Sequence, residues 1–169
     1  MNRIAKFHKV SFEQFLEDWV DTFGNTYQEE KIIEIYNNIK LPKRKTTYSA
    51  GHDISIPFSK IVLPQQTLKI PTGLRCEIDS DYVMLVFPRS SLGIKKNMYI
   101  TNTIPVIDAD YFEANNEGHI FLSIKNGGDK ILELNNGDAI VQAIFLQYGV
   151  ADEEEILNKR MGGVGSTGL

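Results

Sequence analysis

The sequence has little cysteine and no long apolar run. Cys76 is the single cysteine among 169 residues, so the chain cannot form a disulfide with itself. No apolar run approaches the roughly 20 residues that a membrane-spanning helix needs. The segment from Met1 to His8 shows no apolar region of a secretory signal. We therefore expect a cytoplasmic protein that makes no membrane contact.

An excess of positive charge is also absent. The 22 Asp and Glu residues outnumber the 18 Lys and Arg residues and give a net charge of −4 at pH 7. This balance argues against a nucleic-acid partner. The length and a hydrophobic content of 42% suffice for a real core. We expect residues 1–169 to form a single domain.

The spacings typical of zinc sites and of serine nucleophiles are missing as well. His8, His52 and His119 stand far apart, and no cysteine pair accompanies them. No Gly-x-Ser-x-Gly sequence is present, and no histidine is obviously paired with Ser90 or Ser91. We therefore expect neither a zinc site nor a serine nucleophile.

Residues 11–40 have the apolar pattern of two helices. Apolar side chains recur at helical spacing over residues 12–23 and again over residues 32–39, with charged side chains on the other faces. The sequence therefore predicts a helical hairpin over residues 11–40. Its predicted end signals are the capping boxes Ser11–Gln14 and Thr26–Glu29, a stop at Gly24 and a second stop before Pro42.

From Lys43 onward, short apolar runs alternate with Gly, Pro, Asn and Asp. These runs have the length and spacing of strands in a sandwich or barrel, and residues 3–10 predict one more strand. The runs over residues 82–87 and 140–146 are almost continuously apolar, so we expect them to be central strands. The predicted strands after residue 43 cover residues 54–56, 61–63, 67–70, 74–78, 82–87, 98–100, 104–107, 120–124, 131–134 and 140–146.

The stretch from Thr101 to Tyr111 holds the strongest candidate for catalysis. An apolar run ends at Ile107, and Asp108 follows it directly. A carboxylate that is backed by rigid apolar structure and faces a polar cleft is suited to act as a general base. Asp110 lies two residues further on and would point the same way if the segment were extended.

Two other segments carry polar groups that suit a phosphate. Arg89, Ser90 and Ser91 follow a predicted strand and offer a guanidinium group, hydroxyls and backbone donors. Gln142 is one amide within a strongly apolar run. A buried amide needs a partner, which a water molecule, a phosphate oxygen or the backbone could supply.

The end of the chain, from Gly162 to Gly168, is rich in glycine. It lacks the lysine of a Walker loop, and no helix can follow it. Its glycines would let the backbone approach a phosphate chain closely, and Ser166 and Thr167 would add hydroxyl donors. The segment would therefore suit a flexible lid.

Five segments of the chain, taken in sequence order, resemble the five ordered motifs of the trimeric deoxyuridine triphosphatases (dUTPases). The resemblance covers about residue 41 to the end of the chain. Five motifs in register are far more specific than any one of them. The five segments are Ala50–Ile54, Pro88–Leu92, Val106–Tyr111, Gly137–Gln142 and Gly162–Gly168.

The resemblance implies a mainly β fold, a distorted jelly roll of the dUTPase type, that forms a homotrimer. It implies active sites shared between chains, with a C-terminal arm over residues 152–169 that closes over a neighbour's nucleotide. The implied reaction is hydrolysis of dUTP to dUMP and pyrophosphate, with Mg²⁺ held mainly by the triphosphate. Such an enzyme limits uracil in DNA and supplies dUMP for dTMP synthesis.

Carried over motif by motif, the resemblance implies roles for individual residues. Asp108 is the general base for the water that attacks the α-phosphorus, Gln142 helps to hold the water or phosphate, and Asp53 supports the site. The phosphate contacts are Arg89, Ser90 and Ser91. Tyr111 contacts the deoxyribose. Asn102 and the backbone from Thr103 through Val106 to Ile107 contact the uracil edge. The arm contacts are Lys159, Arg160, Val164, Ser166 and Thr167.

The chain departs from the family pattern at several positions. Val164 stands where the arm usually has an aromatic residue that stacks on uracil, and Lys159 stands where it has an arginine. Because lysine lacks the bidentate fork that arginine offers a phosphate, we expect an active enzyme with a weaker lid. The other departures are Ser91 and Pro105 in place of glycines, Ala139 in place of an arginine, and an insertion over residues 113–117.

Two other functions share parts of this pattern. The dCTP deaminases have the same fold, but they typically carry Pro-Gly-Phe where this chain has Ala109, Asp110 and Tyr111. A nucleotide-sensing regulatory protein could keep the pocket and bind a protein partner through residues 11–40. We expect the apolar faces of that hairpin to pack against the chain's own β structure, because large apolar faces must be covered, and docking to a partner is the alternative.

Overall fold

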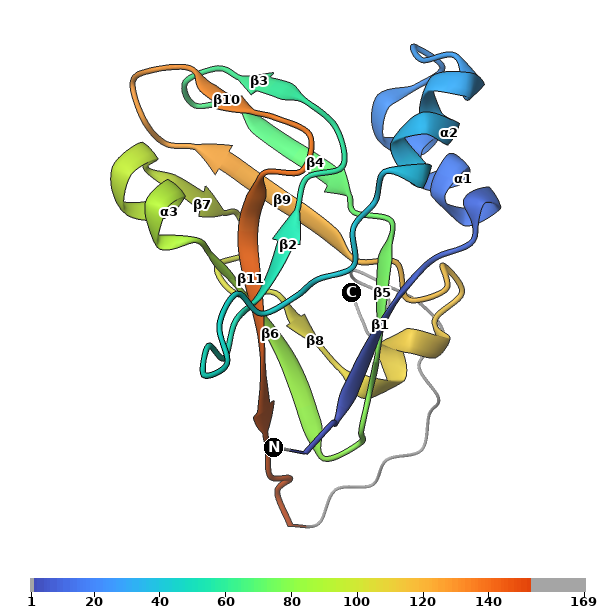
Figure 1. Cartoon of the computed structure of the whole chain (residues 1–169), viewed down its shortest axis with the longest axis vertical. Helices are drawn as coiled ribbons and strands as arrows, with labels where there is room; N and C mark the ends of the chain where they lie inside the picture. The colour runs from blue at the N-terminus through green and yellow to red at the C-terminus, as the bar shows by residue number, and fades with distance from the viewer. Residues whose placement is uncertain (1, 153–169) are drawn as a thin grey trace.

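Strands form the body of the molecule (Figure 1). The structure is a computed structural model, and it describes residues 2–152. The predicted mainly β fold of jelly-roll type is confirmed, and each segment predicted as a strand overlaps one. The strands are β1 Ala5–Lys9, β2 His52–Ser55, β3 Lys60–Val62, β4 Thr67–Pro71, β5 Leu74–Ile78, β6 Tyr82–Pro88, β7 Met98–Ile100, β8 Val106–Ile107, β9 Phe121–Asn126, β10 Leu132–Leu134 and β11 Ala139–Gln147.

One sheet carries most of the motifs, and its four strands have the order β2-β11-β6-β8. β11 and β6 lie in its middle, as their continuous apolar sequence predicts. They pair antiparallel, with Val141 opposite Pro88. β2 pairs along the other edge of β11, with Asp53 opposite Gln142. Three segments that are far apart in sequence are therefore fixed side by side.

A second sheet, with the order β4-β9-β7, contributes much of the core. Ile70 of β4 and Ile124 of β9 are fully buried, and each such side chain contributes about 1.5–3 kcal/mol through removal from water. The remaining strands form two pairs, β1-β5 and β10-β3. The first pair places Cys76 opposite Phe7, and burial raises the pKa of the Cys76 thiol to about 12.

The predicted helical hairpin is confirmed at one side of the strands (Figure 1). Its helices are α1, Phe12–Phe23, and α2, Glu29–Asn37. Phe15 and Trp19 of α1 are fully buried, and the Trp19 ring meets the Phe58 ring edge to face with 5.1 Å between centroids. The chain therefore covers the apolar face of its own hairpin, as expected. In residues 2–152, no helix is long and apolar enough to cross a membrane.

The start of α1 keeps half of the predicted capping box. The Ser11 hydroxyl accepts the backbone N–H of Gln14 at 3.1 Å. The backbone N–H of Ser11, however, donates to the carboxylate of Glu117 at 2.8 Å rather than to the Gln14 side chain. A carboxylate is a stronger acceptor than an amide, so the distant residue replaces the local one.

The link between the helices differs from its prediction. Gly24 ends α1 with a φ of 68°, as expected. The second capping box is wrong, because α2 begins only at Glu29 and Gln28 precedes it without a side-chain cap. The Thr26 hydroxyl instead donates to the backbone oxygen of Phe23 at 3.0 Å, so it closes the turn after α1.

Two short helical turns were not predicted. They are α3, Ser90–Lys96, and η1, a 3-10 helix over Ala109–Glu113 that follows Asp108 directly. A 3-10 helix has 3.0 residues per turn, so residues two apart point in different directions. The expectation that Asp108 and Asp110 share one side of an extended segment is therefore wrong.

Candidate functional site

Three of the predicted motifs meet at one end of the four-stranded sheet. Asp53 comes from β2, Gln142 from β11, and Arg89 follows the last residue of β6. Arg89 Nε lies 3.5 Å from Asp53 Oδ1, and the Arg89 backbone N–H donates to the Ile140 oxygen at 3.2 Å. Because β11 lies between β2 and β6, strand pairing alone brings these side chains together.

The Gln142 side chain occupies the space that the missing side chain of Gly51 leaves open. A Cβ atom at Gly51 would lie 2.4 Å from Gln142 Oε1 and 3.3 Å from Gln142 Cβ. A residue larger than glycine would therefore displace the amide. The first and fourth motifs thus fit together through one close approach, which explains a glycine directly before the acidic strand.

A strongly basic pocket of about 690 Å³ opens beside these residues. Asp53 lines the pocket, is 17% exposed, and has an ion pair with Lys45 over 3.4 Å. A concentration of positive charge around two carboxylates, those of Asp53 and Asp138, suits a polyphosphate that carries a cation. The cationic side chains that line it are Lys40, Lys43, Arg44, Lys45 and Arg89.

The donor set for a metal ion is small in this pocket. Asp53 Oδ2 is buried and accepts no hydrogen bond, and its ion pair is the one with Lys45 Nζ over 3.4 Å, which a cation or a water bound to one would replace. In the part of the chain that the structure describes, no three His, Cys, Asp or Glu side chains cluster as metal ligands. The residues present therefore fit a Mg²⁺ ion that takes most of its ligands from phosphate oxygens and water.

Ser90 and Ser91 begin α3 beside Arg89, and both are exposed. They do not line the basic pocket, although the arginine next to them does. The structure thus places the predicted phosphate contacts next to the pocket, with Arg89 turned into it.

The predicted nucleoside contacts gather at a different place. Asn102 and Tyr111 line a second pocket, of about 450 Å³, between the segment before β8 and strands β4 and β9. Tyr111 is 6% exposed, and its hydroxyl donates to the backbone oxygen of His119 at 2.7 Å. Asn116 donates its side-chain N–H to the same hydroxyl at 3.0 Å. Two bonds therefore fix the Tyr111 ring.

The hairpin from Asn102 to Ile107 has an unusual backbone. Thr103 has a φ of 66°, in the left-handed region that a β-branched residue rarely adopts. Pro105 is buried, and its oxygen accepts the backbone N–H of Val86 at 3.1 Å. The proline therefore anchors the hairpin to β6, and no donor is lost, because the oxygen rather than the nitrogen makes the bond.

The predicted base, Asp108, lies away from the basic pocket of its own chain. Ile107 pairs with Met84 on β6, and Arg89 is five residues beyond Met84. At about 3.3 Å per residue, roughly 17 Å of strand separate the two ends. Figure 1 agrees, with α3 to the left of β11 and the yellow turn of η1 to its right. One chain therefore does not bring Asp108 and Arg89 to the same phosphate.

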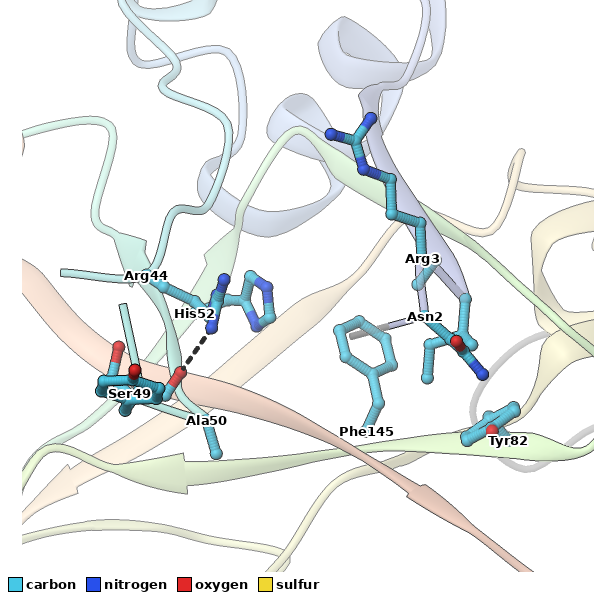
Figure 2. Close-up of a pocket in the computed structure, with 11 residues that line it drawn as sticks. Asn2, Arg3, Arg44, Ser49, Ala50, His52, Tyr82 and Phe145 are labelled. Carbon is cyan, nitrogen blue, oxygen red and sulfur yellow. Dashed lines mark hydrogen bonds between the residues drawn. The ribbon is translucent and has the colours of Figure 1, made fainter. Parts of the chain in front are cut away.

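A third pocket, of about 660 Å³, lies beside the first motif (Figure 2). His52 and Phe145 face each other there with 5.5 Å between ring centroids. Burial lowers the pKa of His52, and its Nδ1 is buried without a hydrogen bond. Arg44 at the rim donates to the Ser49 backbone oxygen at 3.3 Å. The pocket thus combines this aromatic pair with two arginines, Arg3 and Arg44.

Sequence patterns did not reveal a group of polar residues next to Tyr111. Asp18 lines the nucleoside-contact pocket, and His119 and Glu117 bond to residues of the helical hairpin. Burial raises the pKa of Glu117, but hydrogen bonds from the Ser11 hydroxyl and N–H outweigh it and lower the pKa overall. No local signal could have identified these residues, because each pairs with a partner about 100 positions away.

The arm contacts cannot be placed in the same way. Lys159, Arg160, Val164, Ser166 and Thr167 lie outside the residues that the structure describes.

Comparisons with known proteins agree with the motif pattern. A family model described as dUTPase matches residues 37–168. The deoxyuridine 5'-triphosphate nucleotidohydrolase of Lactococcus lactis is 37% identical over 143 residues, which cover 82% of this chain and 95% of that protein.

Two solved structures have the same fold. The dUTPase from Streptococcus mutans has a TM-score of 0.64 and 30% identity, and the match covers 86% of this chain and 98% of that one. The dUTPase from phage phi11 of S. aureus has a TM-score of 0.65 and 18% identity, with coverage of 92% and 97%, so its likeness shows the fold alone.

Proposed function

The chain belongs to the dUTPase family, and on that premise we propose that it hydrolyses dUTP to dUMP and pyrophosphate in the cytoplasm. It would thereby limit uracil in DNA and supply dUMP for dTMP synthesis. The observation that carries the proposal is that Asp53 and Arg89 line one basic pocket, with Gln142 paired opposite Asp53 on the neighbouring strand. A separate pocket with Asn102 and Tyr111 supplies the second half of a nucleotide site.

The basic pocket would bind the triphosphate. Arg89 can offer its guanidinium to phosphate oxygens, and Ser90 and Ser91 stand beside it with hydroxyl donors. The triphosphate would carry Mg²⁺, with Asp53 facing the ion's hydration shell. When bound, the ion neutralises charge that develops on the phosphate oxygens. Gln142 would hold the attacking water or a phosphate oxygen with its amide.

Asp108 would act as the general base. Its carboxylate would take a proton from water as the water oxygen attacks the α-phosphorus, and pyrophosphate would leave. Because roughly 17 Å separate Asp108 from Arg89 along β6, the base for one triphosphate would come from another chain. A homotrimer with shared active sites meets this requirement.

Exposed apolar side chains support the assembly. Val106, Leu146 and Val150 are 55%, 47% and 73% exposed, and β8 and β11 present the first two beside the motifs. A surface of this kind is commonly buried between subunits. Light scattering of the purified protein would measure the trimer directly.

The nucleoside would occupy the pocket of Asn102 and Tyr111. The Asn102 amide and the backbone from Thr103 to Ile107 would bond the uracil edge. A cytosine would leave buried groups unpaired, so the site would reject it. The Tyr111 ring would lie against the deoxyribose and leave no room for a 2′-hydroxyl.

A substrate panel tests the proposed function. The full chain is incubated with dUTP, dCTP, dTTP or UTP in the presence of Mg²⁺, and the products are identified. We expect dUMP and pyrophosphate from dUTP alone. Deamination of dCTP would instead support a dCTP deaminase, and binding without turnover would support a nucleotide-sensing regulator that acts through residues 11–40.

Removal of residues 158–169 should lower kcat/KM for dUTP by about tenfold, because the phosphate contacts of Lys159, Arg160, Ser166 and Thr167 would be lost. The loss should be modest for a lid of this kind, since Val164 offers no ring to stack on uracil. Steady-state kinetics of the full and shortened chains give the ratio. Equal values would contradict a closing arm.

A further inference from the structure

His119 lies where the helical hairpin meets the pocket of Tyr111. Its side chain is fully buried, and its Nε2 accepts the backbone N–H of Gly73 at 2.8 Å. Nε2 is therefore the acceptor nitrogen, and Nδ1 carries the proton. That proton is donated to Asp18 Oδ2 of α1 over 2.5 Å. The His119 imidazole thus bonds both to α1 and to the turn between β4 and β5. The two bonds together select one tautomer.

The backbone of the same residue holds the ring that would contact the sugar. The His119 oxygen accepts the Tyr111 hydroxyl at 2.7 Å. Two residues, Asp18 and His119, therefore link α1 to Tyr111 through hydrogen bonds. A shift of the imidazole would move the carbonyl that fixes the Tyr111 hydroxyl.

The helix end of this connection is rigid. Gln14, one turn before Asp18, donates its amide to the same carboxylate oxygen at 3.1 Å. Phe15, from the same turn, is fully buried and lies 6.1 Å from the His119 ring. The carboxylate therefore has one orientation, set by α1.

A second set of contacts joins α1 to the residues that follow Tyr111. Ser11 donates its hydroxyl to Glu117 at 2.7 Å, and Arg75 lies 3.8 Å from the same carboxylate. The Arg75 guanidinium also covers the Phe112 ring at 3.6 Å and donates to the Phe112 oxygen at 2.6 Å. The residues inserted after Tyr111 are thus bonded to the start of α1, so this insertion and the helical hairpin form one unit.

We propose that Asp18 and His119 are positioning residues of the nucleotide site, through which the helical hairpin sets the Tyr111 ring. Asp18 stands outside the residues that the family model matches, yet it lines the same pocket as Asn102 and Tyr111. The hairpin is then part of the machinery that distinguishes deoxyribose from ribose. This inference rests on the proposed function, in which Tyr111 lies against the sugar.

The test is Asp18→Asn in the full chain, assayed with dUTP and UTP. We expect KM for dUTP to rise about tenfold, the effect of one charge-assisted hydrogen bond, with kcat changed less than about twofold. The preference for dUTP over UTP should fall by a similar factor. Asp21→Asn is the matched control, because it makes the same change at an exposed position of α1 and should leave both values unchanged.

A double-mutant cycle with Tyr111→Phe separates positioning from general loss of stability. Tyr111→Phe removes only the hydroxyl, which bonds to the His119 oxygen and to the Asn116 side chain, so it should raise KM by itself. Asp18→Asn should then add little, because both changes break one connection. Thermal melts of every variant show whether a kinetic change follows unfolding.

Three outcomes would overturn the inference. The first is equal kinetics of Asp18→Asn and Asp21→Asn, and the second is additive effects in the double-mutant cycle. The third is an unchanged KM in Tyr111→Phe, and this result alone decides the matter if Asp18→Asn does not fold. A wild-type chain that leaves dUTP intact would instead refute the proposed function. The two failures are therefore distinguishable.

Discussion

Asp108→Asn should lower dUTP turnover by about 10³-fold while dUTP binding stays close to that of the wild type. An asparagine has nearly the shape of aspartate, so the pocket would keep its form, but its amide cannot take a proton from water. Pyrophosphate release measures turnover. Titration of the variant with dUTP and Mg²⁺ measures binding, because the titration ends before the slow variant hydrolyses the nucleotide.

Asp110→Asn is the matched control for this change. Asp110 stands two residues away on η1, is exposed like Asp108, and loses the same charge in the variant. It should retain most of the activity, because a 3-10 turn directs it away from Asp108. Near-normal turnover of Asp108→Asn would refute its role as the base.

Gly73→Ala should lower the free energy of unfolding by about 3 kcal/mol, with a fall in Tm of roughly 10 °C. Gly73 has a φ of 70°, which alanine adopts only with strain. The new Cβ would also lie 2.2 Å from Ile39 Cδ1 and 3.3 Å from Phe15 Cδ2, both of which are buried. Thermal and urea melts of the two proteins measure the difference.

Gly24→Ala separates the two causes. Gly24 has nearly the same φ, 68°, but a Cβ there would meet no heavy atom within 4 Å. With a ψ of −173°, Gly24 lies in a region that is essentially confined to glycine, so backbone strain alone should cost about 1–3 kcal/mol at this position. A loss at Gly73 no larger than that at Gly24 would mean that packing around Ile39 and Phe15 adjusts freely.

The strands and the two long helices could be predicted because their signals are local. β11 and β6 have continuous apolar sequence and lie in the middle of the sheet, and α1 buries the face that its periodicity marks. The short helices α3 and η1 were not predicted because they hold only seven and five residues. So few residues cannot show the periodic spacing of apolar side chains that marks a helix.

The chemical groups of the site could be named from motifs, but their distribution in space could not. The motif resemblance assigns Asp108 and Arg89 to active sites shared between chains, but only strand register shows how far apart they lie along β6 of one chain. Register depends on pairing between distant segments, and a shift of one residue would reverse every side chain. The spacing of residues along the chain contains no such information.

The connection from Asp18 to His119 was beyond prediction for the same reason. Its two ends are 101 residues apart, and neither sits in a recognisable pattern. The first capping box shows how a distant group can even replace a local one, since Glu117 takes the bond that Gln14 was expected to make. Local rules describe the choices that a backbone N–H has, and tertiary packing selects among them.

The burial of the Cys76 thiol protects the one sulfhydryl of the chain from oxidants. With a pKa of about 12, the sulfur is almost entirely protonated at neutral pH, and the thiolate is the form that peroxides and disulfides attack. Because the chain has no other cysteine, oxidants have no sulfhydryl to modify while β1 and β5 stay paired.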